Sequence, residues 1–342
     1  MGSCISKGKG RQLNHVDLLD LDAQDNYLVL VPAGASLPQD QATIKGKLPN
    51  YTQKPCEDKL VSRVEKNEET WKGIGYACRK GLKSDPFNQD DFCITRKGEH
   101  LLLSVFDGHG PDGHHISAYA RERLPELVLD EGDPSRMGYH IKQAFEKVHR
   151  EIMDNHSDFN SDFSGTTASV VVISGQNLYT AHVGDSTVVI SRRVQGGFDA
   201  EVLTRDHKPA NLRERERIED SGGEVRRLPG DFPYRVFQSG TGIPGLAVSR
   251  AIGDGIAHQV GVTHIPEVTT VALTSDHSFL LLCSDGVWEF LSPQDAVSLV
   301  GTFGWQQAQE AAETLAAEAW RKWVSEEQQT VDDITVVLAY FR

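Results

Sequence analysis

Acidic side chains stand at the ends of several apolar segments of this sequence. The run LLLSVF leads into DGHG at Asp107, and the run FLLLCS leads into DG at Asp285. Asp332 comes just before the run ITVVLAYF, and Asp185 lies in VGDS, which predicts the tight turn of a hairpin. Each motif alone is typical of an ordinary turn, because Asp and Gly are common turn residues. Four such acids in one chain favour a shared site.

Taken together, the four acids predict a metal centre. In an antiparallel sheet the end of one strand and the start of its neighbour lie at the same edge, so Asp107, Asp285 and Asp332 can converge. Converging carboxylates repel one another unless cations or protons neutralise them. Oxygen ligands without cysteine suit Mg²⁺ or Mn²⁺ better than zinc. Because Gly108 has no side chain, the backbone there can approach closely, and its carbonyl can also be a ligand.

Such a centre predicts hydrolysis by an activated water. Two ions that share Asp107 would hold a bridging water and lower its pKa. His109, two residues further on, would be placed to protonate a leaving group. This chemistry requires no serine or cysteine nucleophile, and none of the cysteines lies in a Cys-x₅-Arg phosphate loop.

Composition narrows the class of protein. The net charge of −14 over 342 residues argues against a general nucleic-acid binder, which needs a basic face for phosphates. The five cysteines are odd in number and lack CxxC spacing, which favours a reducing, cytosolic setting over a disulfide framework or zinc ribbon. No stretch approaches the length of apolar sequence that a membrane span needs.

From Trp71 onward, short segments rich in β-branched and aromatic residues predict strands. Amphipathic helices are predicted over 137–153 and 305–324, and a third begins at Ser292, which is followed by proline at the first helical position. Strands and helices each come in pairs along the chain. The pattern therefore predicts an α+β fold, an antiparallel β-sandwich flanked by helices, and not alternating βαβ units.

The first 13 residues predict a lipidated basic tail. Gly2 and Ser6 match the M-G-x-x-x-[ST] pattern for N-myristoylation, and Cys4 lies where a second acyl chain could be added. Lys7, Lys9 and Arg11 add positive charge. A single myristoyl chain binds membranes only marginally, so palmitate or attraction to anionic lipid would supply the second signal. We expect attachment to the cytoplasmic face of a membrane, or a cytoplasmic protein if the tail is unmodified.

Residues 14–69 are interpreted as an extension or linker of unknown role. The stretch NYLVLVP predicts either a short strand or a docking segment. A solvated helix around 56–69 also fits, because Leu60, Val61 and Val64 share a helical face.

Several blocks carry a resemblance to a known family. They are SDPFNQDDF, VFDGHGPDGH, FSGTTASVVVI, AHVGDSTVV, RDHKPANLRERERIEDSGGEV, GLAVSRAIGD, LLCSDGVWEFLS and DDITVVLAYF. In this order they resemble the metal-dependent protein Ser/Thr phosphatases of type 2C (PPM), over nearly all of 71–342. The resemblance implies a four-layer α-β-β-α catalytic domain over 70–342, with a flap subdomain at about 206–255. It also implies two Mg²⁺ or Mn²⁺ ions and hydrolysis of phosphoserine and phosphothreonine in phosphoproteins. We expect a monomer.

The resemblance implies roles for individual acids. The implied metal ligands are Asp107, Gly108, Asp285, Asp332, Asp90, Asp185 and Glu289. Asp107 would bridge both metals and Gly108 would give its carbonyl oxygen. Asp90 would hold metal-bound waters, and Asp185 would bind a third, weaker ion together with Asp285.

The resemblance also implies residues for the reaction itself. His109 matches the general acid, and Thr167 matches a hydroxyl near the phosphate. Two positions depart from the usual pattern: Gln89 stands where many animal members have Glu, and Glu289 stands where Asp is more usual. The arginine that binds substrate phosphate in many members has no unambiguous match. The candidates are Arg79, Lys80 and Lys83.

The segment 206–255 contains further charged residues that we interpret as structural. Glu214, Glu216 and Arg217 fit an exposed helix face. Asp254 is interpreted either as structural or as supporting the site from behind its ligands, and His207 as a packed or hydrogen-bonding histidine. Two rival functions stay open at this point. One is a pseudophosphatase that only binds partners, against which the presence of all the key acids counts. The other is a hydrolase of small phosphate esters.

Overall fold

The computed structural model describes residues 27–33, 60–63, 73–97, 100–130, 136–154 and 159–341. The predicted lipidation residues Gly2 and Cys4, with the tail 1–13 and most of the segment 14–69, lie outside these ranges. No helix in the described part of the chain is both long and apolar enough to cross a membrane.

Two antiparallel sheets form the centre of the molecule. The first joins, in spatial order, β15 (Glu267–Ala272), β8 (Asn177–Val183), β7 (Ala168–Ser174), β5 (His100–His109), β4 (Asp90–Lys97), β1 (Tyr27–Ala33) and β2 (Leu60–Arg63). The short strand β6 (Gly165–Thr166) pairs with β5 and with β14 (Ile252–Gly253). The second sheet joins β10 (Gly197–Val202), β9 (Thr187–Val194), β16 (His277–Cys283), β17 (Ile334–Tyr340) and β3 (Ile74–Arg79).

The sheets pack face to face, with helices on both outer faces. Phe92 and Leu103 of the first sheet belong to the same buried cluster as Leu280 and Val337 of the second. Because successive side chains on a strand point to opposite faces, Leu102 of β5 instead packs beneath the helices. Both faces of β5 and of β16 are therefore buried, which explains why these strands are continuous apolar runs in the sequence.

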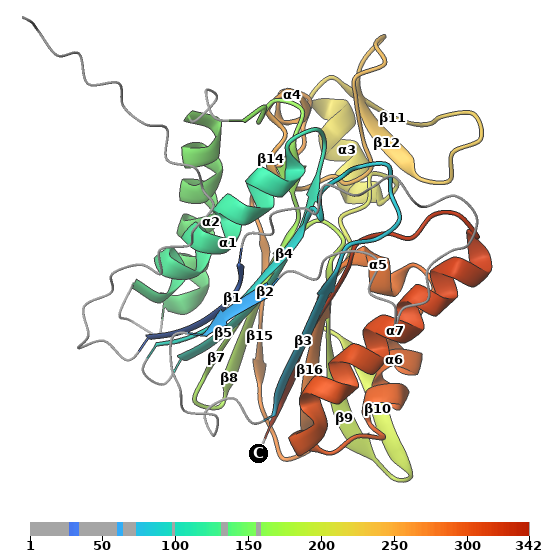
Figure 1. Ribbon diagram of the computed structural model, residues 1–342. Coiled ribbons are helices and arrows are strands. Elements are labelled where there is room, and N and C mark those ends of the chain that lie inside the picture. The colour runs from blue at the N-terminus through green and yellow to red at the C-terminus, as the bar shows by residue number, and fades with distance from the viewer. Residues whose placement is uncertain are drawn as a thin grey trace, which may run out of the picture.

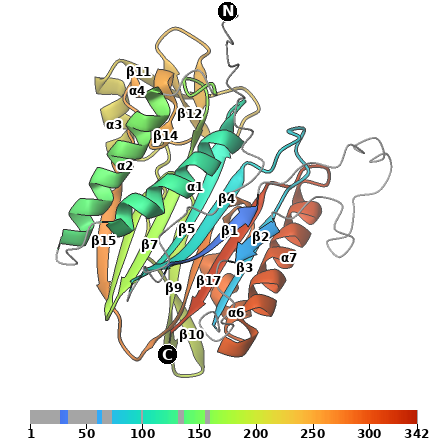
Figure 2. The same cartoon turned by 60° about the vertical axis from the view of Figure 1, so that its left-hand side comes forward.

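The helical layers complete the predicted α-β-β-α order (Figure 1). Helices α1 (Gly113–Asp130) and α2 (Met137–Asp154) cover the first sheet. The second sheet is covered by α6 (Pro293–Val300) and α7 (Ala308–Glu326), with the short α5 (Asp285–Trp288) and the 3₁₀ turn Trp305–Gln307 beside them. Figure 2 shows the two helical layers on opposite sides of the sheets. The fold class predicted from the sequence is confirmed.

The predicted helices are also confirmed in detail. The apolar face predicted for 137–153 is the buried face of α2. Ser292 caps α6 by accepting a hydrogen bond from the backbone N–H of Asp295, with proline in the first turn. Helix α7 lies so close to β3 that a Cβ atom on Gly75 would come within 2.0 Å of the Ala308 carbonyl oxygen. A side chain at this position would push the helix off the sheet.

Two local expectations were wrong. Leu60–Arg63 form strand β2, paired with β1, where a helix around 56–69 was considered. Pairing with the edge of the sheet satisfies the backbone of these residues, and it outweighs a helical pattern of only three apolar residues. The alternative of a strand in NYLVLVP is confirmed as β1, which pairs with β4. Strand β5 does not end at Asp107 but continues through His109, because it pairs there with β6.

A smaller unit rises above the sheets within the segment predicted as a flap. It contains α3 (Leu212–Asp220) and a separate sheet of β11 (Gly223–Arg227), β12 (Tyr234–Gln238) and β13 (Pro244–Leu246). The helix α4 (Gly255–His258) follows it. Ile218, Val225 and Val236 share a small buried cluster with Ala257, which fixes this unit against α4.

Candidate functional site

Four of the predicted ligands meet at one edge of the two sheets. Asp107 lies near the end of β5 and faces Asp90 of β4 in register. Asp285 is the first residue of α5, directly after β16, and Asp332 stands just before β17. The Asp285 side chain is hydrogen-bonded to that of Asp107, and Asp90 and Asp332 also repel the charge of Asp107. Neighbouring strands from both sheets therefore bring acids that are far apart in sequence to one place.

Crowding makes these carboxyl groups difficult to ionise together. Burial, followed by repulsion from Asp285 and the other acids, raises the pKa of Asp107 well above its usual value. Burial and the charge of Asp285 raise the pKa of Asp332 to about 8. Burial and the charge of Asp333 raise the pKa of Asp90 to about 7. Without added positive charge, the cluster retains protons at neutral pH.

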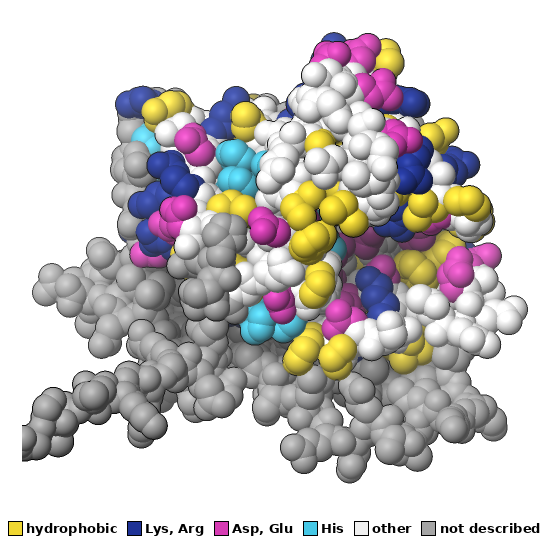
Figure 3. Space-filling model, turned by 90° about the horizontal axis from the view of Figure 1, so that it is seen from above, with side chains coloured by type: hydrophobic (Ala, Val, Ile, Leu, Met, Phe, Trp, Pro, Cys, Tyr) yellow, Lys and Arg dark blue, Asp and Glu magenta, His cyan; other side chains and the backbone are white. Residues whose placement is uncertain are grey.

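Two lysines supply part of the positive charge. Lys83 contacts Asp332, and Lys208 contacts Asp185. Burial favours the neutral amines, but the adjacent acids outweigh it and raise the pKa of both lysines. Figure 3 looks down on this face, where acidic and basic side chains lie next to one another. All the acidic ligand atoms are oxygens, so the residues present fit hard divalent cations such as Mg²⁺ or Mn²⁺.

Hydrogen bonds fix the orientation of the acids on both sides of the cluster. Asp90 Oδ2 accepts from Ser284 Oγ and from Thr335 Oγ1, each at 2.7 Å. Asp333 accepts from the backbone N–H groups of Gly81, at 2.7 Å, and Gln89, at 2.9 Å. Asp333 therefore secures the loops of the site through their backbone, while its neighbour Asp332 faces the other acids.

The glycines that follow two of the acids are required by close packing. A Cβ atom on Gly286 would lie 1.9 Å from the Asp333 carbonyl oxygen. A Cβ atom on Gly108 would lie 2.4 Å from the Gly113 carbonyl oxygen and 2.7 Å from that of Gln89. The repeated Asp-Gly motif therefore reflects backbone segments that pass very close to the acids. It is not a simple turn.

Thr167 holds the backbone of Asp107 in place. The Thr167 N–H donates to the Asp107 carbonyl at 2.9 Å, and the Asp107 N–H donates to Thr167 Oγ1 at 3.1 Å. The same hydroxyl is bonded to Ser186 Oγ at 2.8 Å. In this structure Thr167 positions Asp107.

Asp185 is near the cluster, but not in the hairpin that its motif predicted. It lies between β8 and β9, which belong to different sheets, so the chain crosses there from one sheet to the other. The sequence suggested a hairpin because two strands with a two- or three-residue connection usually pair. The Asp185 charge contributes to the raised pKa of Asp285, after burial. Glu289 is exposed at the end of α5, one turn after Asp285.

His109 is held by Asp254, for which the sequence predicted either a structural role or support of the site from behind its ligands. Its Nε2 lies 2.7 Å from Oδ2 of Asp254, which is buried. Burial opposes a charge on His109, but the charge and hydrogen bond of Asp254 outweigh it and raise the pKa of His109. A Cβ atom on Gly165 would lie 2.1 Å from Asp254 Oδ2, so the glycine leaves room for the pair. The two residues are 145 positions apart, and neither of the sequence motifs in which they lie predicts the contact.

The three basic candidates for phosphate binding have different contacts. Arg79, the last residue of β3, is buried and contacts Glu313 of α7. Lys80 is buried and donates to the Gly81 carbonyl at 3.4 Å. Lys83 is exposed and contacts Asp332, so it is the candidate that is placed beside the acids and open to a substrate.

We expect Lys83→Met to raise KM for a phosphopeptide about tenfold, with a smaller effect on kcat, because one charge contact to phosphate is worth about 1.4 kcal/mol. Lys142→Met, at an exposed position on α2, serves as the matched control. Steady-state kinetics on both variants check the prediction. An unchanged KM for Lys83→Met would assign phosphate binding to another residue.

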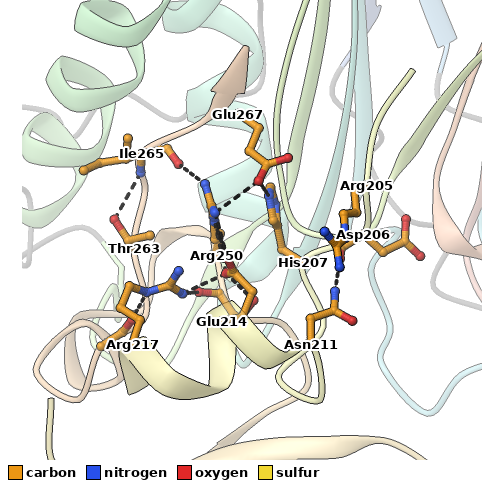
Figure 4. Close-up of polar contacts among 12 residues, drawn as sticks. Arg205, Asp206, His207, Asn211, Glu214, Arg217, Arg250, Thr263, Ile265 and Glu267 are labelled. Carbon is orange, nitrogen blue, oxygen red and sulfur yellow. Dashed lines mark hydrogen bonds and ion pairs between the residues drawn. The ribbon is translucent and has the colours of Figure 1, made fainter. Parts of the chain in front are cut away.

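Glu214 is not on an exposed helix face. It is buried, and its carboxylate binds Arg250, Arg217 and the hydroxyl of Ser249 (Figure 4). Arg250 also contacts Glu267 of β15, at 3.3 Å. The run RERERIED predicts an exposed helix because almost every residue is charged, and only the tertiary partners show that this acid ties α3 to the sheet.

The acid cluster predicts how stability depends on pH. Asp90 and Asp332 have pKa values of about 7 and about 8 in the folded protein, far above the ordinary value of 3.8. Above pH 4 the folded state therefore keeps protons that the unfolded chain releases, and these bound protons stabilise the folded state. Their contribution to the free energy of unfolding is lost as pH rises through 7 and 8. In the absence of divalent cations, we expect the free energy of unfolding to fall by about 3 kcal/mol from pH 6.5 to 8.5.

The half-buried His149 and the buried His207 act in the opposite sense but at lower pH. Burial lowers the pKa of each to about 2, so they destabilise the fold only below the ordinary value of 6.5. Thermal unfolding at several pH values, with EDTA and with Mg²⁺, checks the prediction. Saturating Mg²⁺ should flatten the dependence between pH 6.5 and 8.5. A flat curve in EDTA would contradict the account of the cluster.

Comparison with known proteins is consistent with this site. The sequence model described as protein phosphatase 2C matches residues 78–327. "Probable protein phosphatase 2C 72" of Arabidopsis thaliana is 36% identical over 256 residues, covering 70% of this chain and 76% of that protein. "Probable protein phosphatase 2C 35" of the same plant is 32% identical over 286 residues, covering 75% and 80%. The crystal structure of serine-threonine phosphatase 2C from Toxoplasma gondii matches with a TM-score of 0.66 and 21% identity, covering 78% and 94%, which shows a shared fold.

Proposed function

This chain belongs to the protein phosphatase 2C family, and we propose that its acid cluster binds two Mg²⁺ or Mn²⁺ ions that serve the hydrolysis of phosphoserine and phosphothreonine. Membership of the family makes the chain a protein Ser/Thr phosphatase. The two-ion proposal is supported by one observation above all. Four acids from both sheets meet at a single edge, where they cannot ionise together without added positive charge. A third, weaker ion would lie beside Asp185.

The residues around the cluster would divide the work of the reaction. When bound, the cations would neutralise the acids, orient the phosphate and lower the pKa of the water that attacks it. Lys83 would contact the phosphate of the substrate as a point charge. Asp254 holds the Nε2 side of His109 and favours its charged form, so Nδ1 is the ring atom that would give a proton to the leaving serine or threonine oxygen.

A comparison of three substrates tests this proposal. The full chain would be assayed with Mn²⁺ on a phosphothreonine peptide, on the same peptide with phosphotyrosine, and on glycerol phosphate. We expect kcat/KM to be at least tenfold higher for the phosphothreonine peptide than for either of the others. A higher kcat/KM for glycerol phosphate would instead favour a hydrolase of small phosphate esters.

We further propose that the protein is tethered to the cytoplasmic face of a membrane. Support comes from the sequence alone, from Gly2 in its myristoylation pattern, Cys4 and the nearby basic residues. Co-expression with an N-myristoyltransferase should give a chain that sediments with phosphatidylserine vesicles. Gly2→Ala should abolish this sedimentation, and Cys4→Ser should leave myristoylation intact. Equal sedimentation of the wild type and Gly2→Ala would contradict the proposal.

A further inference from the structure

Three histidines gather beside Gly253 and Asp254. His149 comes from α2, His258 from the end of α4, and His264 from the loop before β15. The ring centroid of His149 lies 4.3 Å from that of His258 and 4.1 Å from that of His264. One ring nitrogen from each lies within 4.8 Å of the other two. All three side chains are half-buried, so solvent reaches them.

Two ring nitrogens of these histidines have no hydrogen-bond partner among the described residues. Nδ1 of His258 donates to the Asp254 carbonyl at 3.1 Å, so the neutral ring carries its lone pair on Nε2. Among the described residues nothing pairs with this buried Nε2, nor with the buried Nδ1 of His264. A metal-binding histidine usually donates its other N–H to a backbone carbonyl or a carboxylate, which orients the ring and fixes its tautomer. His258 has that arrangement.

A second cluster shows the contrast. His182, His207 and Glu267 also lie within 4.8 Å of one another. There Arg250 binds the carboxylate of Glu267 (Figure 4). One ring nitrogen of each histidine is engaged by backbone groups. The buried Nε2 of His207 has no hydrogen-bond partner among the described residues and lies 3.7 Å from the Glu267 carboxylate. A cation at that place would have to displace a guanidinium. We interpret this second cluster as part of the network that ties α3 to the sheet.

We propose that His149, His258 and His264 form a binding site for a transition-metal ion of the Zn²⁺ class, separate from the carboxylate cluster. Three imidazole nitrogens and one water would complete a tetrahedral shell, as in zinc sites with three histidines. Imidazole is a softer ligand than carboxylate, so this site would prefer Zn²⁺ or Co²⁺ to Mg²⁺. The two kinds of site would therefore take different metals.

Binding requires a limited rearrangement of the rings. Nitrogens around a tetrahedral Zn²⁺ lie about 3.3 Å apart, because each Zn–N distance is ~2.0–2.1 Å. The metal must also lie in the plane of each ring, so the stacked rings have to turn. His149 would give up the hydrogen bond that its Nδ1 accepts from the Gly253 N–H, at 3.2 Å. Releasing it leaves the N–H of the buried Gly253 without this acceptor, a cost that the bonds from metal to nitrogen must outweigh.

One acid and two arginines act on the charge of this cluster. Asp254 favours positive charge near His258, and Arg217 opposes it. Arg150, an exposed residue of α2, opposes it near His264. Burial lowers the pKa of all three histidines, so the rings are neutral and can act as ligands at neutral pH. Both hydrogen bonds from the cluster end on Gly253 and Asp254, so the ion would bind beside the residue that holds His109.

The test measures metal binding and needs no turnover. The full chain, in saturating Mg²⁺ to fill the carboxylate cluster, would be titrated with Zn²⁺ by calorimetry and with Co²⁺ by visible absorption. We expect one Zn²⁺ per chain with low-micromolar affinity, and the intense Co²⁺ absorption of a tetrahedral site. His258→Asn and His264→Gln should each weaken Zn²⁺ binding at least tenfold and remove the tetrahedral Co²⁺ spectrum.

A control histidine outside the cluster and a second variant within it show whether a loss of Zn²⁺ binding is specific to the proposed site. His277→Gln, at the opposite end of β16 from Asp285, should bind Zn²⁺ as the wild type does. If His258→Asn lowers the melting temperature, His264→Gln tests the site instead, because His264 is the more exposed of the two positions. Binding that is equal in the wild type and both variants would place Zn²⁺ at the carboxylates and overturn the proposal. An absence of any Zn²⁺ binding in saturating Mg²⁺ would overturn it too.

Discussion

Replacing Asp285 with asparagine is expected to lower kcat/KM on a phosphothreonine peptide by roughly a thousandfold, which corresponds to ~4 kcal/mol of activation free energy. Asp285 is hydrogen-bonded to Asp107. After burial, the charge of Asp285 is the largest cause of the raised pKa of Asp107 and of Asp332. It is therefore central to the cluster. An amide offers one neutral oxygen where the carboxylate offers charge, so divalent cations would be held far less tightly.

The same variant is expected to be more stable than the wild type when cations are absent. Burial and repulsion from Asp185 raise the pKa of Asp285, so its charge costs free energy in the folded state. At pH 8 in EDTA, Asp285→Asn should melt a few degrees higher, and adding Mn²⁺ should stabilise it less than the wild type. Asp199→Asn, an exposed acid on β10, is the control and should change neither quantity. A fully active or strongly destabilised Asp285→Asn would contradict this view of the site.

The second large effect is expected at His109. Loss of a general acid costs 10²–10⁴-fold, so His109→Gln should lower kcat on the phosphothreonine peptide by about a hundredfold or more. p-Nitrophenyl phosphate has a leaving group that needs no proton, and we expect a much smaller loss on it. Equal losses on both substrates would assign His109 a structural role.

Asp254→Asn separates the positioning of His109 from its presence. Asp254 raises the pKa of His109 against the effect of burial. Activity falls as pH rises through the pKa of a general acid, because the proton is lost. Without Asp254 that pKa decreases, so the fall in kcat should move to lower pH. If kcat of Asp254→Asn falls at the same alkaline pH as kcat of the wild type, the contact between Asp254 and His109 does not control the reaction.

Much of the site was predictable because its acids lie next to segments whose secondary structure is evident from the sequence pattern. Asp107 and Asp285 each follow a continuous apolar run, and Asp332 precedes one, so their places at strand ends follow from period and composition. Helices α2, α6 and α7 were predictable for the same reason, since each has an apolar face or a cap that is local in sequence.

What could not be predicted depends on partners far away in sequence. The connection at Asp185 reads as a hairpin until the sheets to which β8 and β9 belong are known. Glu214 reads as solvated until Arg250 is placed beside it. The contact of His109 with Asp254 joins the end of β5 to the residue between β14 and α4, and no spacing or periodicity encodes it. In each case the local pattern is compatible with two environments, and tertiary packing selects one.

The acid cluster is expected to work only when divalent cations neutralise it. The most direct test is phosphate release from a phosphothreonine peptide by the full chain, titrated with Mn²⁺ from a metal-free state, with the melting temperature recorded at each step. We predict no turnover in EDTA, and a rise of turnover and melting temperature over the same range of Mn²⁺. Turnover that persists in EDTA, or a melting temperature that ignores Mn²⁺ while turnover increases, would contradict the claim.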